Sequence, residues 1–158
     1  MDIKCRDIRI LVNPNITSEQ LWDFYIRNDV CEVGFGKEVA VKPLKHSSLI
    51  IGAFNDDKLV GIARAMFDGL SAVIMEFCLE RELQGENLEY SNGSLIEENK
   101  FEVGKRMGEL LINELRNMGA TFISLDIVKD CEERFYKSMG FRENCGHLSY
   151  YIDERPYV

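Results

Sequence analysis

The sequence predicts a mixed α/β (α+β) fold with a twisted, mostly antiparallel sheet of about seven strands flanked by helices. Residues 48–82 contain three apolar, alternating stretches joined by short polar turns, which is typical of an antiparallel meander. Residues 101–118 have apolar side chains at helical spacing, and a further apolar stretch follows at 121–127. A strand, a helix and a second strand in this order predict one parallel pair with a right-handed crossover.

The amino-terminal part is expected to form one strand and one helix. Residues 7–12 alternate well enough for a strand, and the Asn-Pro pair that follows ends it. Thr17 and Gln20 have the spacing of a capping box, in which the threonine side chain accepts from the N–H three residues later. We therefore expect a helix that begins at this box and runs to about Asn28.

Residues 29–47 follow no clear period. Two glycines and a proline indicate either a short helix or an irregular loop, and loops of this length are often functional. Phe35 lies between the two glycines, where an aromatic ring suits either a substrate pocket or the edge of the core.

The meander is expected to consist of strands at 48–54, 59–67 and 72 to about 82, with turns at 55–58 and 68–69. Strict alternation would divide the side chains of the third strand between two faces. One face would carry Ala72, Ile74, Glu76, Cys78 and Glu80. The other face would carry Val73, Met75, Phe77, Leu79 and Arg81.

Residues 83–100 are polar, contain four glutamates and include one expected tight turn at Asn92-Gly93. A lid over a ligand and a tolerated surface excursion are equally consistent with this composition.

The expected helix at 101–118 has two glycines near its start, Gly104 and Gly108, on either side of the cations Lys105 and Arg106. Free N–H groups at the positive end of a helix dipole form a site for phosphate. The alternative is an ordinary amphipathic helix with a flexible start. Gly119 is expected to end this helix at the C′ position.

The carboxy-terminal part is expected to contain a short helix and two strands. Asp130 and Glu133 have the spacing of a second capping box, which predicts a helix at 131–139 closed by a glycine. The last strands are expected at 141–143 and 147–153. With no repeat, low-complexity tract or linker, residues 1–158 are expected to form a single domain.

Composition excludes several classes of function. The net charge of −8, from 19 basic and 27 acidic residues, argues against a nucleic-acid partner, which needs a basic face. The same charge suits attraction of a cationic substrate or plain solubility. Five scattered cysteines and two distant histidines predict no metal site and free thiols in a reducing cytoplasm. No apolar run approaches the roughly 20 residues that span a bilayer, so neither membrane insertion nor export is expected.

Four stretches resemble motifs of the GNAT superfamily of N-acetyltransferases. Residues 59–64, Leu-Val-Gly-Ile-Ala-Arg, with the turn after them resemble the family's third strand, and residues 72–79 resemble its fourth. Residues 132–141 carry the Phe-Tyr and Gly-Phe pairs of the family's Ala-x-x-Phe-Tyr-x-x-x-Gly-Phe motif. Residues 103–108 resemble its phosphate loop, Gln/Arg-x-x-Gly-x-Gly/Ala, with Arg106 at the middle glycine.

The resemblance implies an acyltransferase that moves the acetyl group of acetyl-CoA directly to an amine, either a small cationic amine or a protein amino group. Its parallel strands would splay apart around the helix at 101–118 to hold acetyl-CoA. The resemblance also allows a homodimer through the final strands. The alternative is a non-catalytic member that binds acetyl-CoA or a partner for regulation.

The same resemblance implies the site residues. Backbone groups of the fourth strand would bind the pantetheine and the acetyl carbonyl, and the start of the helix would bind the pyrophosphate. These groups belong to Phe77, Cys78 and Leu79, and to Val103, Gly104, Lys105, Arg106, Met107, Gly108 and Glu109.

Two side chains would carry the proton transfers. Glu76 is the expected base, or alternatively a carboxylate paired with Arg64. Tyr136 is the expected acid, or alternatively an aromatic residue that packs a helix on the sheet. Cys78 is not expected to act as a nucleophile, because a lone buried cysteine is usually inert.

Overall fold

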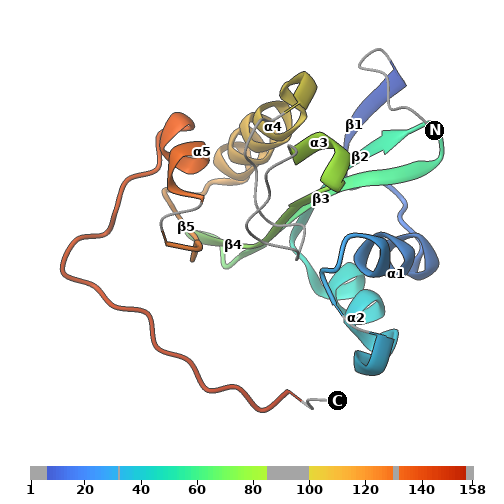
Figure 1. The fold of residues 1–158 in the computed structure, drawn as a ribbon. Coiled ribbons are helices and arrows are strands. Elements are labelled where there is room, and N and C mark those ends of the chain that lie inside the picture. The colour runs from blue at the N-terminus through green and yellow to red at the C-terminus, as the bar shows by residue number, and fades with distance from the viewer. Residues whose placement is uncertain (1–6, 32, 85–99, 130–131, 156–158) are drawn as a thin grey trace.

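The computed structural model describes residues 7–31, 33–84, 100–129 and 132–155, and the statements below concern these residues. They form a sheet covered by helices on both faces (Figure 1). The strands, in the order β1-β2-β3-β4-β5 across the sheet, are β1 Ile8–Val12, β2 Leu49–Asn55, β3 Lys58–Phe67, β4 Ser71–Leu79 and β5 Phe122–Ser124. Neighbours are antiparallel except β4 and β5, which are parallel. The mixed, mostly antiparallel sheet and its parallel pair are therefore confirmed.

The helices cover the two faces unequally. They are α1 Ser18–Arg27, α2 Glu38–His46, α3 Arg81–Gln84, α4 Val103–Met118 and α5 Glu133–Ser138, with 3-10 turns η2 Val33–Phe35 and η3 Lys100–Glu102. One core lies between the sheet and α4 with α5, and the other lies between the sheet and α1 with α2. None of the described helices has the length and apolar character that crossing a bilayer requires.

Local chemistry explains the ends of α1 and α4. Thr17 Oγ1 accepts from the Gln20 N–H at 3.1 Å, and the Thr17 N–H donates to Gln20 Oε1 at 3.0 Å, so both halves of the predicted capping box form. Gly119 follows α4 with φ of 110°, a left-handed conformation that favours glycine. Both predictions are confirmed.

The fully buried side chains of α4 pack against β1, β2 and β3 and anchor the first core. They are Met107, Leu111 and Leu115. Gly108 lies on the same helix where α5 approaches, and a Cβ there would lie 2.1 Å from the sulfur of Met139. The absence of a side chain at this position therefore serves helix packing.

Several boundaries differ from prediction. β4 ends at Leu79 because α3 begins two residues later, and β5 spans three residues instead of 121–127. The predicted loop at 83–100, with its turn at Asn92-Gly93, lies mostly outside the described residues. The predicted capping box of α5 is wrong, because the N-cap is Glu132 and has no side-chain cap bond, while Asp130 is not among the described residues.

The two final strands are also wrong, and the sheet has five strands instead of about seven. Residues 141–143 and 147–153 run as extended chain after α5 without ladder partners (Figure 1). The aromatic and aliphatic side chains that suggested a strand, Leu148, Tyr150, Tyr151 and Ile152, are 80 to 91% exposed. Alternating apolar residues are compatible with a strand, but a strand forms only where it can pair with the edge of a sheet. The edge strand β5 has only three residues for such pairing.

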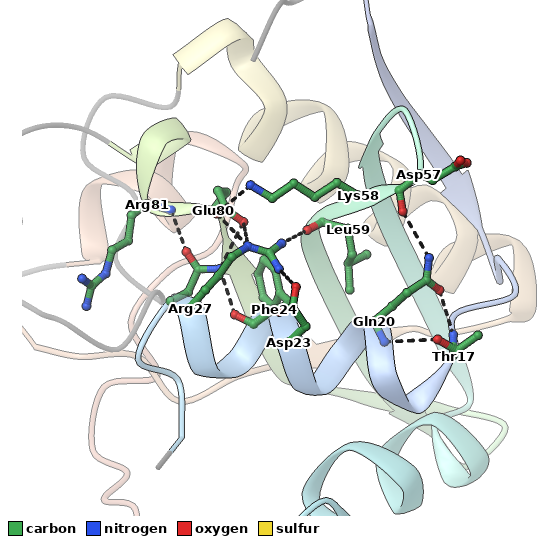
Figure 2. Close-up of polar contacts among 11 residues, drawn as sticks. Thr17, Gln20, Asp23, Phe24, Arg27, Asp57, Lys58, Leu59, Glu80 and Arg81 are labelled. Carbon is green, nitrogen blue, oxygen red and sulfur yellow. Dashed lines mark hydrogen bonds and ion pairs between the residues drawn. The ribbon is translucent and has the colours of Figure 1, made fainter. Parts of the chain in front are cut away.

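A partly buried ion-pair network joins α1 to the end of β4 (Figure 2). Arg27 Nε donates to both oxygens of Glu80 at 2.9 and 3.0 Å, and Asn28 Nδ2 donates to Oε2 at 3.1 Å. Lys58 Nζ lies 3.4 Å from Glu80 Oε1. Burial alone would raise the pKa of Glu80, but the bonds from Arg27 and Asn28 outweigh it and lower that pKa.

Asn28 connects this network to the backbone. Its side chain donates to the Phe24 carbonyl at 2.9 Å and accepts from the Arg81 N–H at 3.0 Å, so it joins the end of α1 to the start of α3. The network therefore fixes α1 against β4 at the point where β4 ends.

We predict that Glu80→Gln lowers the free energy of unfolding by about 2 to 3 kcal/mol, because the partly buried guanidinium of Arg27 loses the less exposed of its two carboxylate partners, Glu80 and Asp23. Urea unfolding measures this change. Glu38→Gln is the matched control, since the Glu38–Lys42 pair is exposed and is worth less than about 1 kcal/mol. Equal changes for the two variants would contradict the structural role of Glu80.

Candidate functional site

A cavity of about 650 Å³ opens where β4 and β5 separate. The two strands pair only at Ser71–Val73 and 122–124, after which the chain that follows β5 leaves the sheet. The cavity is therefore lined from both faces of the sheet. The wall on one face comes from α1, α2 and the segment between them, and the wall on the other face comes from residues 125–128 and α5.

A β-bulge in β4 decides which side chains reach this cavity. Arg64 pairs with Glu76 and Ala65 pairs with Ile74, so Met75 is an extra residue without a partner in β3. The bulge reverses the alternation that follows it. Ala72, Ile74, Phe77 and Leu79 all pack in the core beneath α4, whereas Cys78 packs in the core beneath α1. The predicted faces of the strand are therefore wrong beyond Met75.

Glu76 lies at the centre of a buried polar cluster. Tyr25 on α1 donates its hydroxyl to Glu76 Oε2 at 2.8 Å, and Arg64 Nε donates to the same oxygen. Arg64 also donates to Ser47 Oγ at 3.0 Å. Only 8% of the Glu76 side chain is exposed, and its Oε1 is buried with no hydrogen-bond partner among the described residues. The ion pair with Arg64 is thus present, and one carboxylate oxygen is left over.

The cluster changes the pKa values of its members. Burial, followed by the charge of Glu76, strongly raises the pKa of Tyr25, so its hydroxyl stays protonated. Burial would lower the pKa of Arg64, but Glu76 outweighs it and raises that pKa. Burial and then Glu76 raise the pKa of the Cys78 thiol, which disfavours the thiolate that a nucleophile requires.

Tyr136 reaches the cavity from the opposite face. Its ring packs edge-on against Phe77 and Phe141, with centroids 6.2 and 5.9 Å away. Burial, followed by Glu132 and Cys78, raises the pKa of its hydroxyl. Glu132 is held in turn by the Val128 N–H at 2.9 Å. The aromatic packing role is therefore present, and the phenol lines the same cavity as Glu76.

The backbone of β4 has groups at the opening that no strand of the described sheet pairs. The Glu80 N–H donates to the Val60 carbonyl at 2.7 Å, and antiparallel ladders alternate, so Cys78 bonds to β3. The N–H and C=O groups of Phe77 and Leu79 consequently point away from β3, toward the gap. Gln84 Nε2 donates to the Leu79 carbonyl at 2.5 Å, which occupies one of these groups.

The expected phosphate-binding residues form the first two turns of α4, outside the cavity lining. Val103, Gly104, Met107 and Gly108 are buried, whereas Lys105, Arg106 and Glu109 are exposed. In an α-helix with its N-cap at Glu102, the N–H groups of the first three residues, Val103 to Lys105, are not bonded within the helix, whereas those from Arg106 onward are. The groups suited to an anion are therefore fewer than the motif suggests. Phe101 and Glu102, just before the helix, have left-handed φ values of 58° and 55°.

The structure brings together only part of the predicted site. Glu76, Phe77, Cys78 and Tyr136 line the cavity, while Leu79 and the start of α4 do not. Sequence reasoning missed Tyr25, which occupies an apolar position of an amphipathic helix and gave no sign of a polar partner. It also missed the wall formed by Val30, Cys31 and Val39. Phe35, for which a pocket position was one of two expectations, does line the cavity.

No family model and no curated protein sequence matches the chain. Solved structures do match. A probable acetyltransferase from methicillin-resistant Staphylococcus aureus is 17% identical with a TM-score of 0.71, over 92% of this chain and 98% of that one. A GNAT-family acetyltransferase from Streptococcus pneumoniae is 22% identical with a TM-score of 0.61, over 93% and 99%.

A third match includes a ligand in its description. It is AAC(6′)-Iy in complex with the bisubstrate analogue CoA-S-monomethyl-acetylneamine, at 12% identity and a TM-score of 0.64, over 93% of this chain and 98% of that one. At these identities the matches establish the fold. The described chain has the fold of GNAT acetyltransferases, as the sequence motifs predicted.

The buried hydroxyl of Tyr25 predicts how stability depends on alkaline pH. Its pKa is raised in the folded state, so above about pH 10 the unfolded chain loses a proton that the folded chain keeps, and stability falls. We expect Tyr25→Phe to flatten this fall by up to about 1.4 kcal/mol per pH unit between pH 10 and 11. Urea unfolding at each pH measures it.

Tyr151→Phe is the control for this experiment, since that ring is 89% exposed and its replacement should leave the slope as it is. Identical slopes for the wild type and Tyr25→Phe would show that the Tyr25 hydroxyl is not buried against Glu76.

Proposed function

We propose that this protein is an N-acetyltransferase that transfers the acetyl group of acetyl-CoA directly to an amine. The observation that carries the proposal is the cavity between the diverging strands, where Glu76 and Tyr136 arrive from opposite faces of the sheet. The shared fold with acetyltransferase structures supports acetyl transfer in general terms. A complex of one such structure with a CoA conjugate supports the choice of donor.

The donor would lie along the open edge of β4. The N–H of Phe77, which points into the gap, is suited to polarise the thioester carbonyl in the manner of an oxyanion hole. The N–H groups of Gly104 and Lys105 at the start of α4 would bind the pyrophosphate, with Lys105 and Arg106 adding positive charge.

The acceptor would enter from the wall formed by α1 and α2. Its nitrogen lone pair attacks the carbonyl carbon, and the carbon–sulfur bond breaks as the new carbon–nitrogen bond forms. The proton that the nitrogen sheds passes to Glu76 Oε1, directly or through water, because Oε2 is occupied by Tyr25 and Arg64.

The leaving thiolate takes a proton from Tyr136. A tyrosine phenol is protonated at neutral pH, as a proton donor must be. Tyr136 lines the cavity beside Phe77, so the acid and the proposed carbonyl-binding N–H belong to neighbouring, packed residues.

A regulatory protein that binds acetyl-CoA without turnover is the second candidate. The exposed Arg106 side chain at the place of the family's middle glycine favours it, since a side chain there crowds a bound phosphate.

Titration calorimetry tests donor binding. We expect acetyl-CoA to bind with a Kd below 1 mM, and the double variant Lys105→Ala/Arg106→Ala to weaken binding about tenfold in a salt-dependent way. Arg116→Ala removes a cation from the opposite end of α4 and is the control. No binding at millimolar acetyl-CoA would contradict both candidates, whereas binding without thiol release in the presence of amines would favour the regulatory one.

Replacing the acid tests the chemistry. Tyr136→Phe keeps the packing against Phe77 and should lower kcat about 100-fold with little change in acetyl-CoA affinity. Release of free thiol measures the rate. Tyr150→Phe, at an exposed ring outside the cavity lining, should leave kcat unchanged. An unaltered kcat in Tyr136→Phe would leave the tyrosine with its packing role alone.

A further inference from the structure

The wall that would receive the acceptor is mostly apolar. Between α1 and α2 it consists of Val30, Cys31, Phe35 and Val39, all of them only partly buried. Val30, Cys31 and Val39 pack with one side against the core beneath α1, and the cavity lies along their remaining surface. Apolar side chains with a few polar groups are the usual lining of a small-molecule site.

The rim of the cavity continues this apolar surface. Met75, the bulge residue of β4, is 56% exposed, and Ile127 after β5 is 36% exposed. Both line the cavity. A ligand that covered them would remove apolar surface from water, which stabilises binding by roughly 25 cal/mol per Å².

The described residues of the lining have a formal charge of −1, whereas the whole chain carries −8. Three carboxylates face two cations, Arg64 and Arg155. Each carboxylate already has a partner: Glu76 binds Arg64 and Tyr25, Asp126 accepts from Ser149 at 3.1 Å, and Glu132 accepts from the Val128 N–H. Arg155 in turn pairs with Asp153, so the charged side chains of the described lining are all engaged within the protein.

One lining residue, Glu76, has a buried acceptor atom that no described group satisfies. Glu76 Oε1 has no hydrogen-bond partner among the described residues, while the carboxylate as a whole is neutralised by Arg64. A buried acceptor without a donor is costly, and a single amine N–H satisfies it. The remainder of the amine molecule would lie against the apolar wall between α1 and α2, and this contact is favourable only if the remainder is itself apolar.

We infer that the acceptor is a primary amine on an alkyl or aryl body, with its nitrogen at Glu76 Oε1 and its body along Val30, Phe35 and Val39. This inference rests on the proposed function and specifies its substrate. It excludes polyamines as preferred acceptors, because their second ammonium would have to lose its water against the apolar wall.

The test compares hexylamine with 1,6-diaminohexane, which has the same chain length and a second ammonium. We expect hexylamine to have a kcat/KM at least tenfold higher and to bind at least tenfold more tightly in calorimetry with coenzyme A present. From butylamine to hexylamine, kcat/KM should rise about fourfold per methylene group. Equal or better use and binding of the diamine would overturn the inference.

Two variants on α2 test whether this helix causes the preference for hexylamine over the diamine. Val39→Asp places a carboxylate in the wall and should reduce the preference for hexylamine below threefold. Val41→Asp adds the same charge on the same helix outside the cavity lining and should leave the preference unchanged. Equal responses of the two variants would remove α2 from the acceptor site.

Failure of the inference and failure of the proposed function give different results. Binding of acetyl-CoA with preference for the diamine contradicts the inference alone. Absence of acetyl-CoA binding contradicts the proposed function, while binding of hexylamine over the diamine to the free protein would still support an apolar amine site.

Discussion

The cavity depends on a mismatch of one residue between β3 and β4. Met75 has no partner in β3, and this single extra residue turns Phe77 and Leu79 toward α4 and Cys78 toward α1. Without the bulge, strict alternation would send Glu76 into the apolar core beneath α4, where a carboxylate has no partner. With it, Glu76 lies opposite Arg64 and within reach of Tyr25 on α1. The bulge therefore decides which face holds the polar cluster.

The second constraint is the short contact between β4 and β5. Three residues of parallel ladder hold β5 to the sheet, and the strands separate at the level of the bulge. Within the part of the chain that the structure describes, separation leaves backbone groups of β4 without a strand partner, which is costly in a buried position unless another donor or acceptor replaces the strand. Gln84 supplies such a group at Leu79, and we propose that a thioester donor supplies it at Phe77. The network of Arg27, Asn28 and Glu80 fixes the end of β4 just beyond this opening.

Elements that local chemistry specifies could be predicted from the sequence. The capping box at Thr17, the polar turn before β3 and the glycine after α4 each depend on residues close in the chain. The bulge could not be predicted, because a period of two contains no sign of an unpaired residue. The prediction of final strands at 141–143 and 147–153 was wrong for a related reason, since apolar alternation does not show whether a sheet edge is available for pairing.

Only part of the candidate site could be predicted from the sequence. Glu76 and Tyr136 were found through motifs, and both line the cavity. Tyr25 was not found, since its partner is 51 residues away and only the fold brings them together. The glycine motif predicted a helix that is present as α4, but Gly108 serves contact with Met139, which directly follows α5.

The proposed donor site requires that the open edge of β4 binds the thioester through the Phe77 N–H. Residue-resolved amide hydrogen exchange by NMR, with and without acetyl-CoA, tests it most directly. We predict that acetyl-CoA slows amide exchange at Phe77 at least tenfold, whereas exchange at Cys78, whose N–H is already bonded to β3, changes little. If acetyl-CoA binds while exchange at Phe77 stays the same, the donor does not lie between β4 and β5.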